Sequence, residues 1–256
     1  MKIKILKLTT LIAYILMVAT NYLAVLLPLN GINTAEISDS YPNLFTPAGY
    51  AFSIWGLIYT LLAVYVINQF RSSNTELTNR INKFFIVNCL LNAAWIFAWH
   101  YNFIGISVVI MLGILYSLIN ISDIINTNKL TRTERWKFDI PFRVYFGWIT
   151  VATIANITIF LVSIDWNGFG IPSNIWTIII LLVGTIIGSI RALKDKSIPY
   201  ALVIIWAYLA IFVEHNSNDG WQGMYFEITL VVGLCIAVLL GIIFSIYRKG
   251  NEEVLV

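Results

Sequence analysis

Eight long apolar segments constrain the fold of this chain more than any other feature of its sequence. They cover residues 7–29, 47–70, 82–100, 103–124, 141–163, 174–192, 198–214 and 224–247. A helix of roughly 20 residues crosses the hydrocarbon core of a bilayer, and each segment is about that long. Hydrophobic residues make up 59% of the chain and charged residues only 11%, which excludes an ordinary soluble domain. We therefore expect an all-α, polytopic membrane bundle of eight transmembrane helices.

The basic residues test this number of spans independently of hydropathy. The 16 Lys and Arg residues fall in five groups, at positions 2–7, 71–83, 129–143, 191–196 and 248–249. With eight spans these groups occupy the N-terminus, every second loop and the C-terminus, so they share one side of the membrane. Cytoplasmic loops carry an excess of Lys and Arg, which predicts that both termini are cytoplasmic, in a plasma or inner membrane. The net charge of +3 thus reflects topology, and we expect no nucleic-acid partner.

The stretch from residue 45 to residue 59, FTPAGYAFSIWGLIY, is dense in aromatic and small residues. Pro47 suits the first turn of a helix, where its missing N–H would have no partner. Phe52, Trp55 and Tyr59 then recur at helical spacing, which places three rings on one face beside small residues. Such a face can close on another helix through its small residues, or on a flat ligand. These residues alone leave both interpretations open.

Two further segments carry stripes of aromatic and amide side chains at helical spacing. The members are Asn88, Asn92, Trp95 and Trp99 in the third segment, and Tyr145, Trp148, Ala152 and Asn156 in the fifth. A buried amide that faces lipid without a partner costs several kcal/mol, so both stripes should face protein or a cavity. Hydrogen bonds between helices are the alternative to a ligand cavity. We expect Trp55, Asn92, Trp95, Trp148 and Asn156 to converge on one cavity beneath the loop 30–46.

Three separated motifs resemble the TspO/MBR family, the tryptophan-rich sensory proteins or translocator proteins. The motif that opens the family's second helix is similar to residues 46–59, with matches at Pro47, Phe52, Trp55 and Tyr59. Its third-helix Asn-x-x-Trp element resembles Asn92 to Trp95, followed by Phe97. Its fifth-helix pattern is similar to this chain at Tyr145, Trp148, Ala152 and Asn156. The three motifs occur in the family's order, and the resemblance covers about residues 1–163.

The chain also departs from the family pattern. Ala48 stands where the family has a second proline, Tyr50 replaces a tryptophan, and Val144 replaces a proline before the tyrosine. Three further helices have no counterpart in the five-helix family. We therefore divide the chain into a TspO/MBR-like ligand-binding unit, residues 1–163, and an additional three-helix membrane segment, residues 164–256, that packs outside it.

The resemblance implies a pocket within the five-helix bundle that binds porphyrins and other flat apolar molecules such as sterols. In the family, the tryptophans matched by Trp55 and Trp148 are associated with porphyrin binding and with the light-dependent breakdown of the porphyrin. The expected ligand-binding residues are Phe52, Trp55, Tyr59, Asn92, Trp95, Tyr145, Trp148, Ala152 and Asn156. We expect no resident cofactor, with a tetrapyrrole as a candidate ligand for sensing or transport. The expected partners are the lipid bilayer and a small apolar ligand, and a homodimer is left open.

The sequence also bears on two other classes of function. A membrane-embedded enzyme would have to use His100, Glu214, His215 and Asp219 near the outer surface, and these residues lack the spacing of a metal site. An ion-coupled transporter normally needs charged residues inside its helices, and the interiors of these segments are poor in them. The sequence favours binding without catalysis but leaves the question of an enzyme open.

Overall fold

The computed structural model describes residues 2–27 and 29–252. Its long helices are α1 (Lys2–Leu26), α3 (Ile54–Asn68), α4 (Thr75–His100), α5 (Ile104–Asn126), α7 (Ile140–Ser163), α8 (Ser173–Asp195), α9 (Ile198–Asn216) and α10 (Phe226–Glu252). Shorter elements are α2 (Thr34–Asp39), α6 (Arg132–Glu134), a 3₁₀ turn at Gly49–Ser53 before α3 and a π-helical turn at Arg135–Asp139 before α7. Within this part of the chain, eight helices are long and apolar enough to cross a membrane. The predicted all-α bundle of eight spans is confirmed.

Two helix starts differ from the sequence expectation. Helix α4 begins at Thr75, before the apolar segment, because the Asn74 side chain accepts a hydrogen bond from the Leu77 backbone N–H at 3.0 Å. Pro47 lies two residues before the 3₁₀ turn Gly49–Ser53 and not within it. The backbone next to it is tied to α9 instead, since the N–H of Ala48 donates to the carbonyl of Ala210 at 3.1 Å.

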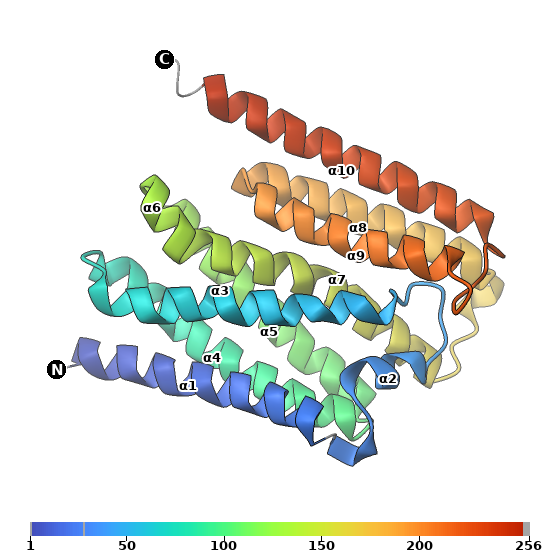
Figure 1. The fold of residues 1–256 in the computed structure, drawn as a ribbon, viewed down its shortest axis with the longest axis horizontal. Coiled ribbons are helices and arrows are strands. Elements are labelled where there is room, and N and C mark those ends of the chain that lie inside the picture. Colours follow the sequence, from blue (N-terminus) through green and yellow to red (C-terminus); the bar gives the residue numbers. More distant parts are fainter. Residues whose placement is uncertain (1, 28, 253–256) are drawn as a thin grey trace.

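The helices are arranged in successive layers (Figure 1). Helix α4 packs between α1 and α5, while α7 packs against α3 and α5 on one side and α9 on the other. Helices α8 and α9 both contact α10, which forms the outermost layer. Helix α7, the fifth span, therefore lies between the first four spans and the last three, and the fold places the chain's fifth-segment motif at that junction.

The approach of α7 to α9 depends on Gly147. A Cβ at this position would lie 2.8 Å from the carbonyl oxygen of Tyr200 and 2.9 Å from Cβ of Val203, which no side chain tolerates without a shift. Close backbone contact at small residues is a common way for membrane helices to associate, because lipid offers no hydrophobic driving force.

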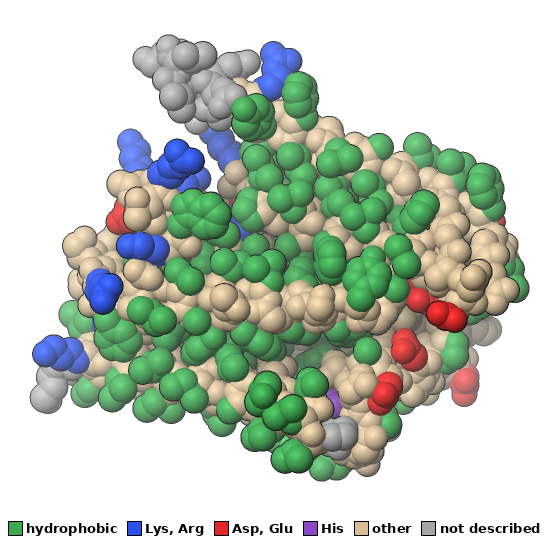
Figure 2. Space-filling model, viewed as in Figure 1, with side chains coloured by type: hydrophobic (Ala, Val, Ile, Leu, Met, Phe, Trp, Pro, Cys, Tyr) green, Lys and Arg blue, Asp and Glu red, His purple; other side chains and the backbone are tan. Residues whose placement is uncertain are grey.

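The surface has the distribution expected of a membrane bundle. In Figure 2 Lys and Arg gather mainly at one end of the visible face and Asp and Glu at the other, with hydrophobic side chains between them. Helix α1 begins and α10 ends at the basic end (Figure 1). Together with the eight spans, this surface identifies an integral, multi-pass membrane protein.

Candidate functional site

Five aromatic side chains form one cluster, and they come from the 3₁₀ turn Gly49–Ser53, from α3 and from α7. Trp55 stacks on Tyr59 with ring centroids 5.4 Å apart, and meets Tyr145 and Trp148 edge to face at 5.8 and 6.3 Å. Phe52 meets Trp148 edge to face at 5.9 Å. The helical spacing predicted from the sequence accounts for the shared face on each helix, and the packing of α3 on α7 brings the two faces together. We call these five residues the aromatic cluster.

Burial within the aromatic cluster is uneven. Tyr145 and Trp148 are buried, whereas Phe52, Trp55 and Tyr59 are only half-buried. The cluster thus has a closed side on α7 and a more open side on α3.

Two polar groups of the aromatic cluster lack hydrogen-bond partners. Among the residues that the structure describes, the indole N–H of Trp148 and the hydroxyl of Tyr59 are buried and unpaired. An unpaired buried donor costs about 1–3 kcal/mol, and most buried polar groups in folded proteins are paired. The backbone of Tyr59 is nevertheless held in place, since its carbonyl accepts a hydrogen bond from the Tyr14 hydroxyl at 2.7 Å.

Asn92 of α4 positions a ring of the aromatic cluster. Its side-chain nitrogen donates to the Tyr145 hydroxyl at 3.0 Å, and its oxygen accepts from the Asn21 amide of α1 at 2.8 Å. Asn92 is 1% exposed. Its amide therefore joins three helices, which is the interhelical hydrogen bonding that the sequence left open.

Trp95 and Asn156 form a second group further along the same two helices. The indole N–H of Trp95 donates to the Asn156 side-chain oxygen at 3.0 Å, and the Asn156 nitrogen donates to the Ser107 hydroxyl of α5 at 2.9 Å. Trp95 also stacks on Trp99 with centroids 5.1 Å apart. Ala152 lies half-buried on α7, between the two groups in sequence. The nine predicted residues thus fall into the aromatic cluster with Asn92, the Trp95–Asn156 pair and Ala152, and their convergence on a single ligand cavity stays a prediction.

A cavity of about 600 Å³ lies elsewhere, between the outer parts of α7 and α8. Its lining includes Leu44, Leu161, Trp166, Trp176, Thr177 and Trp221, and none of the nine predicted residues. Sequence reasoning missed this cavity because its walls come from loops and helix ends that are far apart in the chain. The sequence feature that could have indicated this cavity is the concentration of three tryptophans near the same predicted membrane boundary.

The two histidines anchor the first outer loop. His100 donates from Nδ1 to the carbonyl of Leu29 and accepts at Nε2 from the Thr34 hydroxyl, both at 3.1 Å. His215 donates from Nε2 to the carbonyl of Leu44 at 2.9 Å. Within the described part of the chain, no three His, Cys, Asp or Glu side chains are placed to hold a metal ion.

The basic end holds an ionic network, buried at Arg143 and Asp195, that the sequence analysis does not predict. Arg143 of α7 is 2% exposed and pairs with Asp139 at 2.6 Å and with Asp195 of α8. Arg191 pairs with the same Asp195 at 2.7 Å and with Asp123 of α5 at 2.8 Å. We call these five residues the ionic network. Its sequence signal was the spacing of four residues within each of the pairs 139/143 and 191/195, which places opposite charges on one helix face.

Comparison with known proteins bears on the whole chain. No curated protein and no solved structure matches it significantly. A family model described as TSPO-like protein matches residues 7–246. The matched range includes α8, α9 and most of α10 as well as the first five spans, while the division of the chain at residue 163 stays a prediction. Because the match covers nearly the entire sequence, this protein belongs to the TSPO-like protein family.

Proposed function

We propose that this protein binds a flat apolar ligand, of the porphyrin, tetrapyrrole or sterol class, at the aromatic cluster, for sensing or transport across the membrane. The observation that carries the proposal is the pair of unpaired buried groups, the Trp148 N–H and the Tyr59 hydroxyl, each on a ring that contacts Trp55. A ligand with a carboxylate, hydroxyl or ring nitrogen would satisfy them. Indole rings add a large rigid stacking surface for a planar molecule.

The small residues beside the aromatic cluster favour a face that binds a ligand over a face that packs against another helix. A Cβ added at Gly49 or at Gly56 would meet no atom within 4 Å. A seam of small residues would bring another helix against these two positions, as happens at Gly147. The face of α3 that carries Gly56 is therefore left open next to the half-buried rings of Trp55 and Tyr59.

The ligand would replace contacts between rings of the aromatic cluster. An aromatic pair contributes about 0.5–1.5 kcal/mol beyond its buried area, so separating Trp55 from a neighbouring ring is a modest loss. Inserting a planar molecule restores stacking on both sides and supplies a partner for the Trp148 N–H. Asn92 would keep the Tyr145 ring in place, since its side chain donates to the Tyr145 hydroxyl and is itself held by Asn21 of α1.

In the membrane, we place the basic end of the bundle and both termini on the cytoplasmic side of a plasma or inner membrane. The support is the positive-inside rule together with the gathering of Lys and Arg at the end where α1 begins and α10 ends.

The test is a titration of the purified protein in detergent with protoporphyrin IX, followed by the Soret absorbance so that the readout does not depend on tryptophan number. Trp148→Phe keeps a ring but removes the N–H, and should weaken binding about 2- to 10-fold, the value of one hydrogen bond. The double variant Trp55→Leu, Trp148→Leu should weaken it further. Trp221→Phe, in the lining of the outer cavity, should change little.

Two results would contradict the proposal. Equal affinity of the wild type and the Trp55→Leu, Trp148→Leu double variant would mean that both tryptophans only pack. A loss of affinity with Trp221→Phe but not with Trp148→Phe would place the ligand in the outer cavity.

A further inference from the structure

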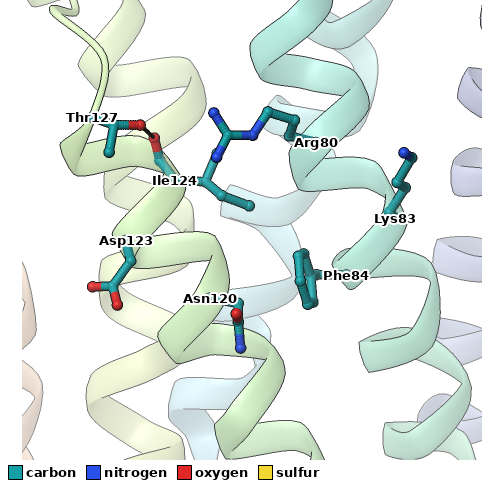
Figure 3. Close-up of a pocket in the computed structure, with 7 residues that line it drawn as sticks. All are labelled: Arg80, Lys83, Phe84, Asn120, Asp123, Ile124 and Thr127. Atoms are coloured by element: carbon teal, nitrogen blue, oxygen red, sulfur yellow. Dashed lines mark hydrogen bonds between the residues drawn. The ribbon is translucent and has the colours of Figure 1, made fainter.

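A second cavity lies between α4 and α5 at the basic end of the bundle. Its volume is about 430 Å³, and its lining consists of Arg80, Lys83, Phe84, Asn120, Asp123, Ile124 and Thr127 (Figure 3). Figure 3 shows the Arg80 guanidinium reaching from α4 toward α5 beside Ile124 and Thr127. Lys83 follows one turn along the same helix.

The charge balance of this cavity is positive. In the described part of the chain, neither Arg80 nor Lys83 has a carboxylate within the 4.0 Å of an ion pair, and both side chains are exposed. Asp123, the acidic residue of the lining, is already compensated, because one of its oxygens pairs with Arg191 at 2.8 Å and with Lys194 at 3.2 Å. Two cations are therefore available to an anion.

An apolar surface continues from the cavity toward the middle of the membrane. Val87 and Leu90 follow Lys83 on the same face of α4 and are 51% and 48% exposed. Tyr116 and Leu112 precede Asn120 on the same face of α5 and are 64% and 47% exposed. The structure thus combines a cationic cavity at one end of the bundle with exposed apolar side chains along two neighbouring helices.

We propose that this cavity binds the phosphate of an anionic phospholipid of the cytoplasmic leaflet, with Arg80 and Lys83 on the phosphate and the acyl chains along α4 and α5. Anionic lipids are concentrated in that leaflet, and basic pockets between membrane helices are suited to their head groups. A soluble phosphate would use the two cations but would gain nothing from the exposed apolar side chains of α4 and α5. These apolar side chains are what favours a lipid over a free anion.

The test compares lipid retention by native mass spectrometry of the full chain, after exchange into detergent with phosphatidylglycerol or with phosphatidylcholine of the same acyl chains. The wild type should retain phosphatidylglycerol preferentially. The double variant Arg80→Gln, Lys83→Gln should reduce that retention about 10- to 30-fold, the effect of two cations near an anionic surface. The matched control is the double variant Lys129→Gln, Arg132→Gln. It also removes one Lys and one Arg from the basic end of the bundle, but at positions that do not line the cavity.

Three outcomes would overturn the proposal. Equal retention by the cavity and control variants would mean that the lipid responds only to total surface charge. No preference of the wild type for phosphatidylglycerol would mean that there is no anion site. Inorganic phosphate at millimolar concentration that raises the unfolding temperature as much as the lipid would make a soluble anion the ligand. The single variant Arg80→Gln is measured in the same way. The side chains of Arg80 and Lys83 are both exposed, so neither substitution removes a buried contact.

Discussion

Replacing Asp195 by Asn should destabilise the bundle, because this carboxylate is the centre of the ionic network. Its side chain is 0% exposed, and it accepts hydrogen bonds from Ser122 and from Asn126, both at 2.8 Å, in addition to its two arginine partners. The substitution preserves the size of the side chain and one acceptor oxygen. It removes the negative charge that Arg143 and Arg191 share.

The size of the expected loss of stability depends on the ion pair that each arginine keeps. Removing one partner of a buried ion pair typically costs about 3–5 kcal/mol, because the other charge remains buried. Here Arg143 retains Asp139 and Arg191 retains Asp123, so we expect the lower end of the range, about 3 kcal/mol. For a chain of this size that corresponds to a fall of roughly 6–12 °C in the unfolding temperature.

The assay is thermal unfolding in detergent, followed by circular dichroism. Asp165→Asn is the matched control, since Asp165 is exposed in an outer loop and Asn tolerates its positive φ of 53°. The double variant Arg143→Met, Asp195→Leu should be less destabilised than Asp195→Asn, because it removes the buried Arg143 charge together with the carboxylate, while Arg191 keeps Asp123. A loss below about 1 kcal/mol for Asp195→Asn would refute the reasoning.

Three further predictions concern topology and packing. Reporter fusions after Lys194 and after Asn218 should give cytoplasmic and external signals respectively, and the reverse pattern would exclude the proposed orientation. Gly147→Leu should destabilise the contact of α7 with α9 by about 1–3 kcal/mol in thermal unfolding, whereas Gly233→Leu, where a Cβ meets no atom within 4 Å, should not. Asn156→Leu leaves a buried indole N–H of α4 unpaired and should cost about 1–2 kcal/mol in the same assay; an unchanged unfolding temperature would show that this hydrogen bond adds no stability.

The spans of this protein were readable from the sequence because hydropathy is a local property. Each apolar segment is long enough by itself to cross a bilayer, and the alternation of basic groups fixes their number. The shared helix faces of Phe52, Trp55 and Tyr59, and of Tyr145 and Trp148, were equally predictable from spacing alone. The family was readable for the same reason, since each of its motifs lies within one short continuous segment of the chain.

The tertiary structure decided which faces meet. The sequence could not distinguish a ligand cavity from interhelical hydrogen bonds at Asn92 and Asn156, because that depends on the rotation of α4 relative to α7. The structure pairs Asn92 with Tyr145 and Asn156 with Trp95. It also buries Arg143, which the sequence presents as one more basic residue of the inner side. The charge pattern along one helix indicates on which side of the membrane a basic residue lies. Whether that residue is buried depends on the acidic groups that neighbouring helices bring to it.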